Sequence, residues 1–339
     1  MAQIDKPNLH FNTKLYTGNS STQSITTGLD NDFVWIKHRT VTSNHRLFDI
    51  LRGGANELGS NTTSAEGQNT QGITFNSTGF DLLGADPSYN GSGNTYASWN
   101  WKAGGTAVSN TAGSITSSVS ANTTAGFSIV KYTGTGASAT VGHGLGVAPN
   151  VIITKKTNVA QQWNFQNSML GYSQYMALNT TEASQATGGG NINAVSSTTY
   201  SCDGNDAVNA SGGTYVSYCF ANIKGFSKFG SYVGNSSATD GTFVYLGFKP
   251  AFVIIKGATN ASSWLIQDNK RQTYNDGSIP LFKANTSDAE INIANFDMLS
   301  NGFKCRTSNN DFNGANTYIY LAIAESPIVG SNGIPTTAR

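Results

Sequence analysis

One short apolar segment occurs three times in this chain. The copies lie at residues 32–37, 150–155 and 251–256 and have the sequences DFVWIK, NVIITK and AFVIIK. Each is dominated by β-branched and aromatic residues and closes with a lysine. Because such side chains pack well on a pleated surface, each copy predicts a buried β-strand.

The repetition extends to anchors on both sides of this segment. Upstream lie related tripeptides at residues 16–18, 132–134 and 232–234, with the sequences YTG, YTG and YVG. Downstream, each copy ends in a further strand-like segment, at residues 95–99, 214–218 and 317–321. The spacing between corresponding anchors stays nearly constant, so we interpret the chain as three homologous repeats.

These repeats define the predicted domain organisation. We expect an N-terminal arm (1–13), repeat domains at 14–103, 127–221 and 222–326, a Gly/Ser/Thr-rich linker at 104–126 and a C-terminal tail at 327–339. Each repeat is large enough for its own core, and the linker contains either an edge strand at 114–119 or flexible chain. No segment has a helical period. Short strands separated by Gly and Asn turns predict an all-β protein of three tandem β-sandwich-like domains.

Composition excludes several classes of protein. Of the 339 residues only 12% are charged, and the net charge is +1. A nucleic-acid-binding protein would show a basic patch, so we expect no nucleic-acid partner. Hydrophobic residues make up 38% and aromatic residues 11%, which is enough for packed cores and argues against disorder.

The cysteines indicate core packing, and the N-terminus indicates where the chain is made. Cys202, Cys219 and Cys305 are odd in number, lack metal-ligand spacing and are expected to pack as small buried hydrophobes. The N-terminal residues have no apolar signal segment, and no run approaches the ~20 apolar residues of a membrane helix. We therefore expect a chain made in a cytoplasm, with no membrane insertion.

The most charged stretch of the chain lies in the first repeat and contains His45, Arg46 and Arg52. A catalytic set, an anion site, a hydrogen-bonded loop and a contact between subunits are the alternatives. The other repeats have WNFQ and WLIQ at the corresponding place, so no catalytic set is shared. We interpret these three residues as inter-subunit contacts, together with Phe226 in the short connector before the third repeat. The same connector predicts close packing of the second and third repeats, with Phe226 in their interface. No catalytic residue, cofactor or metal ligand is predicted.

Several of these segments resemble a family of repeat-containing structural proteins of marine tailed phages, including cyanophages. The resemblance rests on residues 16–18, 33–37, 45–49, 99–105, 117–127, 225–232, 251–256 and 322–327. It covers nearly the whole chain and implies a virion protein, often a tail fibre, spike or other surface appendage. It implies no enzymatic activity, and it carries over no functional residues.

The leading functional hypothesis is a tail-fibre or receptor-binding protein of the virion, made in the host cytoplasm. Polar loops with Tyr89, Trp101, Tyr172 and Tyr175 are candidate contacts to host-surface glycans, because aromatic faces bury area against sugar C–H groups. Each of the four is equally compatible with a core or interface position. We expect partners among other virion proteins and a homo-oligomer, with a trimer favoured because fibres of the type that the resemblance implies are commonly trimeric, which would supply avidity.

Two alternatives stay open. A capsid decoration or head-spike protein would use the N-terminal arm and C-terminal tail to dock on the shell. A glycan depolymerase would need paired carboxylates. Asp49, Glu57, Glu66 and Asp81 are present in the first repeat but form no recognisable motif.

Overall fold

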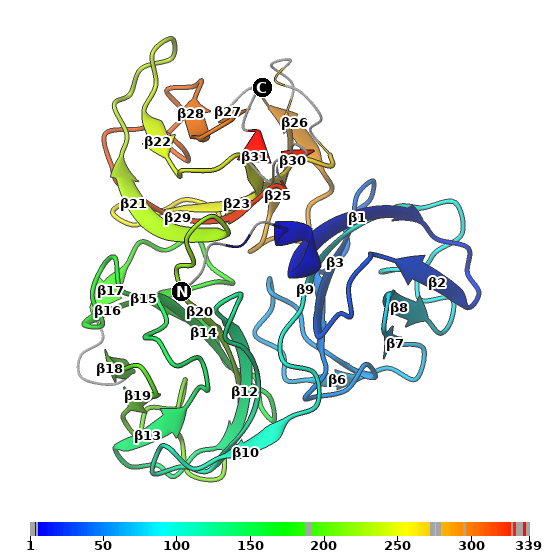
Figure 1. Cartoon of the computed structure of the whole chain (residues 1–339), viewed down its shortest axis with the longest axis vertical. Coiled ribbons are helices and arrows are strands. Elements are labelled where there is room, and N and C mark those ends of the chain that lie inside the picture. The colour runs from blue at the N-terminus through cyan, green and yellow to red at the C-terminus, as the bar shows by residue number, and fades with distance from the viewer. Residues whose placement is uncertain are drawn as a thin grey trace.

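The structure, a computed structural model, is built from β-strands. It describes residues 4, 6–186, 191–271, 275, 279–293, 296–326, 328–329 and 335–336. Among these residues the single helix is a 3₁₀ turn, η1 (Pro7–Leu9), and there is no helix suited to crossing a membrane. The predicted all-β class, with three tandem sandwich-like domains, is confirmed: Figure 1 shows three β lobes around a common centre.

Repeat 1 follows η1 and has nine strands. They are β1 (Phe11–Thr17), β2 (Gln23–Thr26), β3 (Phe33–His38), β4 (Arg46–Asp49), β5 (Asn56–Glu57), β6 (Gly67–Gln68), β7 (Ile73–Asn76), β8 (Gly79–Leu82) and β9 (Thr95–Trp101). The main sheet has the order β1-β9-β3-β4, and a smaller sheet has the order β2-β8-β7. The repeated segment predicted from the sequence is β3, which lies inside the main sheet.

Repeat 2 adds an extension to the same plan. Its strands are β10 (Val108–Asn110), β11 (Ser117–Asn122), β12 (Phe127–Thr133), β13 (Ala139–Gly142), β14 (Val151–Lys156), β15 (Asn164–Asn167), β16 (Gln174–Ala177), β17 (Gln185–Ala186), β18 (Ile192–Val195), β19 (Thr199–Cys202) and β20 (Thr214–Phe220). The main sheet is β10-β11-β12-β20-β14-β15-β16-β17 and the smaller sheet is β13-β19-β18. Thus the Gly/Ser/Thr-rich segment before repeat 2 contributes two strands to its sheet, β11 pairing with β12.

Repeat 3 has the same arrangement without the extension. Its strands are β21 (Ser227–Val233), β22 (Phe243–Tyr245), β23 (Pro250–Gly257), β24 (Leu265–Asp268), β25 (Ile279–Lys283), β26 (Ile291–Ile293), β27 (Phe296–Leu299), β28 (Gly302–Cys305) and β29 (Thr317–Ala324). The main sheet is β21-β29-β23-β24-β25-β26 and the smaller sheet is β22-β28-β27. In the C-terminal tail only residues 328–329 and 335–336 are described, as the paired strands β30 (Ile328–Val329) and β31 (Pro335–Thr336); the rest of the predicted tail lies outside the described residues.

Each main sheet is buried on both faces, which explains why the repeated strand is apolar throughout. In β3, Val34 and Ile36 point into the core between the two sheets of repeat 1. Phe33 and Trp35, at the alternate positions, point to the centre of the molecule. All six residues of β3 are buried, as are those of β14. A strand buried on both sides needs a continuous apolar run, which is the pattern seen in the sequence.

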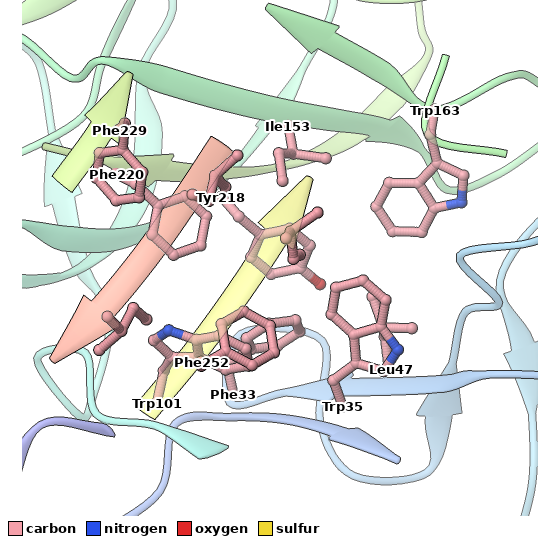
Figure 2. Close-up of a pocket in the computed structure, with 13 residues that line it drawn as sticks. Phe33, Trp35, Leu47, Trp101, Ile153, Trp163, Tyr218, Phe220, Phe229 and Phe252 are labelled. Carbon is pink, nitrogen blue, oxygen red and sulfur yellow. The ribbon is translucent and has the colours of Figure 1, made fainter. Parts of the chain in front are cut away.

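The centre of the molecule is a core shared by all three repeats. Each repeat has a core of its own, as the sequence predicted, but the inner faces of the three main sheets meet in a fourth. Figure 2 shows side chains of the three repeats converging there, among them Phe33, Tyr218 and Phe252. They enclose an apolar cavity of about 30 Å³, and cavities of this kind stay dry.

The three cysteines lie in the separate cores of repeats 2 and 3. Cys202 and Cys219 belong to the core of repeat 2 and Cys305 to that of repeat 3, and none forms a disulfide. Burial raises the pKa of the Cys202 and Cys219 thiols to about 12. They behave as the small buried hydrophobes that the sequence predicted.

Backbone hydrogen bonds join the repeats into a closed ring at three seams. We name them the 1–2, 2–3 and 3–1 seams after the repeats that meet there. One bond recurs at every seam: Gln161 N to Thr63 O (2.8 Å), Ser262 N to Thr181 O (2.9 Å) and Ser43 N to Ser287 O (2.8 Å). A second recurs as Glu66 N to Thr157 O, Ser184 N to Ala258 O and Glu290 N to Arg39 O, each 2.8 Å. The ring therefore has an internal pseudo-threefold axis.

The lysine that closes each repeated strand is buried at a seam. Lys37, Lys155 and Lys256 are fully buried, and each Nζ donates to the carbonyl of the following residue. Lys155 and Lys256 also donate across their seams, to Thr63 O (3.2 Å) and Thr181 O (3.4 Å). Burial lowers the pKa of all three lysines to about 8. Each ammonium group therefore donates to backbone carbonyls, which do not neutralise its charge.

We predict that replacing Lys155 flattens the pH dependence of stability in alkaline solution. Between the folded-state pKa of about 8 and the usual 10.5, the unfolded chain holds a proton that the folded chain has lost, so stability rises with pH. Wild type should therefore gain about 2 kcal/mol more than Lys155→Met between pH 7 and 9.5. Urea unfolding across this range measures the difference. Parallel curves for the two proteins would contradict the lowered pKa.

Candidate functional site

An exposed aromatic pair lies on the edge strand of the small sheet in repeat 3. Phe243 and Tyr245 of β22 are 44% and 60% exposed, while Val244 between them is buried in the core of repeat 3. In the small sheet, β22 pairs with β28 on one side only. Alternation along the strand places both side chains on one outward face, with their Cα atoms roughly 7 Å apart. We call Phe243 and Tyr245 the β22 face.

A lysine supports one of these rings. Lys228 Nζ lies 5.3 Å from the centre of the Tyr245 ring and donates to Tyr245 O at 2.7 Å. A cation over an aromatic face is attracted to the ring, and the hydrogen bond fixes its place. Beside Phe243, the cross-strand partner Lys304 is ion-paired with Asp240. The β22 face is therefore aromatic. Apart from Lys228, the cation beside it is Lys304, whose charge is neutralised by Asp240.

The other two repeats lack this aromatic pair. Strand register aligns Phe243 with Ser24 and Thr140, and Tyr245 with Thr26 and Gly142. The buried residue between them stays apolar in every repeat, as Ile25, Val141 and Val244. The fold thus requires the inward residue but not the outward aromatics. Large exposed apolar groups that folding does not need are typical of interaction sites.

The structure buries two of the four aromatic residues predicted to contact a receptor. Tyr89 has no exposed surface, and its hydroxyl donates to Gln71 O at 2.9 Å. Trp101 is 4% exposed and packs in the central core. Neither can meet a ligand on the surface, because in both cases a sheet of the same chain covers the ring. This corrects the prediction for Tyr89 and Trp101.

The other two predicted aromatics are partly buried in repeat 2. Tyr172 packs against the core of that repeat and donates its hydroxyl to Pro149 O at 3.1 Å. Tyr175 lies in β16 opposite Gln185 of β17. They lie in a different repeat from Phe243 and Tyr245, so the structure does not bring them together with the β22 face.

Three of the four predicted inter-subunit residues lie inside the chain at contacts between repeats. His45 is buried at the 3–1 seam, where Trp35 Nε1 donates to its Nδ1 (2.8 Å) and its Nε2 lies 3.1 Å from Lys283 O. Burial lowers the pKa of His45 to about 3, so the ring is neutral and Nε2 is the donor. Phe226 is buried in the central core, with its ring centre 5.7 Å from that of His10.

Arg52 is the third of these residues, and it forms a buried ion pair at the 1–2 seam. Its Nε donates to Asp49 Oδ2 at 2.5 Å, and Tyr218 of repeat 2 donates to the same oxygen at 2.8 Å. Arg46, the fourth predicted residue, stays within repeat 1, with its Nε 3.5 Å from Glu57 Oε2. All four side chains are therefore engaged by contacts within one chain.

Comparison with models of protein families identifies a family for this chain. The model of a family described as a domain of unknown function, DUF7483, matches residues 6–327. The chain belongs to the DUF7483 family. No curated protein and no solved structure matches the chain. The matched range includes all three repeats, so the DUF7483 unit corresponds to the whole ring rather than to one repeat.

The three repeats of the DUF7483 ring differ in the residues equivalent to Asp49 and Arg52. At the 3–1 seam the pair returns as Asp268 and Arg271, with 2.6 Å between Oδ2 and Nε, and Trp99 Nε1 donates to Asp268 at 3.0 Å. In repeat 2 the corresponding residues are Asn167 and Leu170. These pairs stabilise seams. In the described part of the chain there is no group of three or more His, Cys, Asp or Glu residues that could hold a metal.

We predict that Arg52→Leu destabilises the DUF7483 ring by about 3 to 5 kcal/mol, because it leaves the buried Asp49 carboxylate without its partner. The double variant Asp49→Asn/Arg52→Leu reproduces the residues of repeat 2 and should recover most of that loss. Urea unfolding of both variants against wild type measures the effect. Equal stability of the single and double variants would show that the unpaired charge is not the cause.

Proposed function

We propose that this protein is a virion surface protein of a tailed phage, of the tail-fibre or receptor-binding type, and that it contacts host-surface glycan through the β22 face. The observation that carries the proposal is the pair of exposed aromatic rings present in one repeat of three. The resemblance to structural proteins of marine tailed phages supplies the virion assignment. The sparsely charged surface agrees with a neutral ligand rather than an anionic one.

Aromatic rings suit sugar rings for a physical reason. The C–H groups of a pyranose form an apolar face, and an aromatic ring buries area against it at little cost in side-chain entropy. Phe243 and Tyr245 are on adjacent outward positions, so together they offer a platform longer than one ring. Such contacts are weak one at a time, and several copies on a particle would add avidity.

The four carboxylates considered for a depolymerase are all engaged in other contacts, which accords with binding without catalysis. Asp49 and Glu66 both contact Arg52, and Glu57 lies near Arg46. Asp81 accepts a hydrogen bond from Ser24 Oγ at 2.5 Å. None of these contacts leaves a pair of carboxylates facing one another across an open site. We therefore propose a binding protein and not an enzyme.

A capsid decoration or head-spike protein is the second candidate, and the chain ends favour it. Asn8 N donates to Ser326 Oγ at 2.9 Å, and Ser326 Oγ donates to Asn8 Oδ1 at 2.7 Å. Residues near the two ends of the ring thus lie side by side, which would let the two terminal segments form one attachment point. Immunogold labelling of intact particles with antibody to this chain separates the candidates. Gold at the tail supports the fibre, gold over the head supports the decoration protein, and unlabelled particles contradict both.

We predict that Phe243→Ser/Tyr245→Thr abolishes glycan binding without unfolding the protein. These are the residues that repeat 1 has at the equivalent positions, so stability should change by less than about 0.5 kcal/mol. Binding to purified host-cell polysaccharide, measured by biolayer interferometry, should fall at least tenfold. Val159→Ser, which removes an exposed apolar side chain from repeat 2, is the matched control. Undiminished binding by the double variant would refute the role of the β22 face.

The predicted homotrimer stays a prediction. Within one chain the three repeats already supply a threefold arrangement, and their seams are closed by the hydrogen bonds described above. Multi-angle light scattering at micromolar concentration gives the molar mass. The mass of one 35.7 kDa chain would contradict the trimer.

A further inference from the structure

Four charged residues lie beside the β22 face, on the small sheet of repeat 3, whose strands are on the outer side of that repeat in Figure 1. Lys304 of β28 lies opposite Phe243 on one side and opposite Asp297 of β27 on the other. Arg306 follows two residues later on the same outward side, because Cys305 between them is buried in the core. We call Asp240, Asp297, Lys304 and Arg306 the charged cluster.

The charged cluster consists of two ion pairs, so its net charge is zero. Lys304 Nζ donates to Asp240 Oδ1, and Arg306 Nε donates to Asp297 Oδ2 at 2.5 Å. The hydrogen bond from Lys304 lowers the pKa of Asp240, and the nearby charge of Arg306 lowers it further. The two pairs are therefore neighbours, next to the aromatic rings.

Both pairs leave hydrogen-bonding groups accessible at the surface. The Asp240 side chain is 86% exposed, and its Oδ2 has no partner among the described residues. The Arg306 side chain is 43% exposed, and neither of its Nη atoms has a partner there. The charged cluster thus presents a free acceptor and several free donors to an incoming ligand.

The main chain of Asp240 is held in place although its side chain is exposed. Asp240 N donates to Ser237 Oγ at 2.9 Å, and Asp240 O accepts from Asn235 Nδ2 at 2.8 Å. Cys305 N donates to Thr242 O at 2.9 Å, which joins the end of this loop to β28. A carboxylate on a fixed main chain loses less freedom on binding than one on a mobile loop.

The other two repeats lack the cations of the charged cluster and the loop that carries Asp240. At the places of Lys304 and Arg306, register puts Asp81 and Leu83 in repeat 1 and Ser201 and Asp203 in repeat 2. The loop spans residues 235–241 in repeat 3, whereas its counterparts span only 19–22 and 135–138. The aromatic pair, the cations and the longer loop thus occur together in one repeat, although the fold forms without them in two. Their presence on one surface indicates a single site.

These groups define a ligand that has hydroxyl groups and no net charge. Aromatic rings favour an apolar C–H face, while the free acceptor and donors beside them favour hydroxyl groups, which both donate and accept. An anion would be repelled by the two carboxylates of the charged cluster, and a cation by Lys304 and Arg306. Hydroxyl groups avoid both penalties and still form the stronger, charge-assisted hydrogen bonds. A neutral sugar ring combines these properties.

We propose that the charged cluster extends the β22 face into a site for a neutral sugar with two adjacent free hydroxyl groups. One hydroxyl donates to Asp240 Oδ2 and the next accepts from an Nη of Arg306, while the C–H face of the ring packs on Phe243. This inference rests on the proposed glycan binding by the β22 face. It adds specificity, because the aromatic rings accept any pyranose, whereas Asp240 and Arg306 select sugars whose adjacent hydroxyls are unsubstituted.

Biolayer interferometry of the full chain on purified host-cell polysaccharide tests the class of ligand. Periodate cleaves the carbon–carbon bond between two adjacent hydroxyl-bearing carbons and oxidises both to aldehydes, while periodate is reduced to iodate; borohydride then reduces the aldehydes to alcohols. Polysaccharide treated in this way should bind about tenfold more weakly than a sample treated with borohydride alone. Binding of untreated polysaccharide should stay nearly constant between about 0.05 and 0.5 M salt, since a neutral ligand has no charge to screen.

Two variants test the two residues. Asp240→Ser removes the acceptor, and Arg306→Leu installs the residue of repeat 1; each should weaken binding by about tenfold, the effect of losing one hydrogen bond to a charged group. If Arg306→Leu fails to fold because Asp297 loses its partner, Asp297→Thr/Arg306→Leu replaces it, since repeat 1 has threonine and leucine at these places. Lys102→Ala, which removes an exposed, ion-paired cation from repeat 1, is the matched control and should bind as wild type does.

The outcomes separate this inference from the proposed function. Binding that needs Phe243 and Tyr245 but survives both Asp240→Ser and Arg306→Leu overturns the inference and leaves the proposed function standing. Binding that survives periodate, or that is lost at high salt as for an anionic ligand, also overturns it. If untreated polysaccharide does not bind the wild-type chain, the inference and the proposed glycan binding fail together.

Discussion

Closure of three two-faced sheets around one apolar axis is the constraint on which the rest of the structure depends. Each main sheet has an apolar outer face covered by the small sheet of its own repeat and an apolar inner face that its repeat cannot cover. A repeat alone would expose the residues equivalent to Phe33 and Trp35 to water, at about 25 cal/mol for each Å² of apolar surface. The ring removes the inner faces of all three main sheets from water. Because one repeat cannot cover its own inner face, the family match spans all three repeats, at residues 6–327.

Closing the ring buries polar groups, and the seams show how the chain satisfies them. Backbone bonds recur at all three seams, since they depend on main-chain position and not on side chains. Side-chain solutions differ: two seams use an Asp–Arg pair, and repeat 2 has Asn167 and Leu170 instead. Asn167 and Leu170 carry no charge, and they suffice because Leu321, opposite them at the 2–3 seam, has no side-chain donor. The equivalent residues at the other two seams are Tyr218 and Trp99, which donate to the Asp carboxylates. The residues at each seam therefore vary together.

The sequence predicted the repeats and their strands because these follow from local composition and spacing. It could not predict which aromatics are exposed, because that depends on how sheets distant in the chain cover one another. Tyr89 and Trp101 resemble loop or strand-end residues in the sequence, yet both are covered. Phe243 and Tyr245 were missed because a Phe-Val-Tyr run gives no sign of which side faces water. Aligning the repeats could have revealed them, since only polar or small residues occur at the equivalent positions.

Internal repetition separates the residues that the fold needs from those that it tolerates. Positions that stay apolar in every copy, such as Val34, Ile152 and Val253, belong to cores whose geometry is the same three times. Where one repeat has a different kind of residue from its two counterparts, the shared core geometry does not require that residue. Another cause must then explain why it is there. Phe243 and Tyr245 are exposed aromatic residues where their counterparts are small or polar, and Ala251 leaves volume open that a larger side chain would fill. These departures lie in the third repeat, on its small sheet and at its seam with the first, where the shared architecture sets no requirement for them.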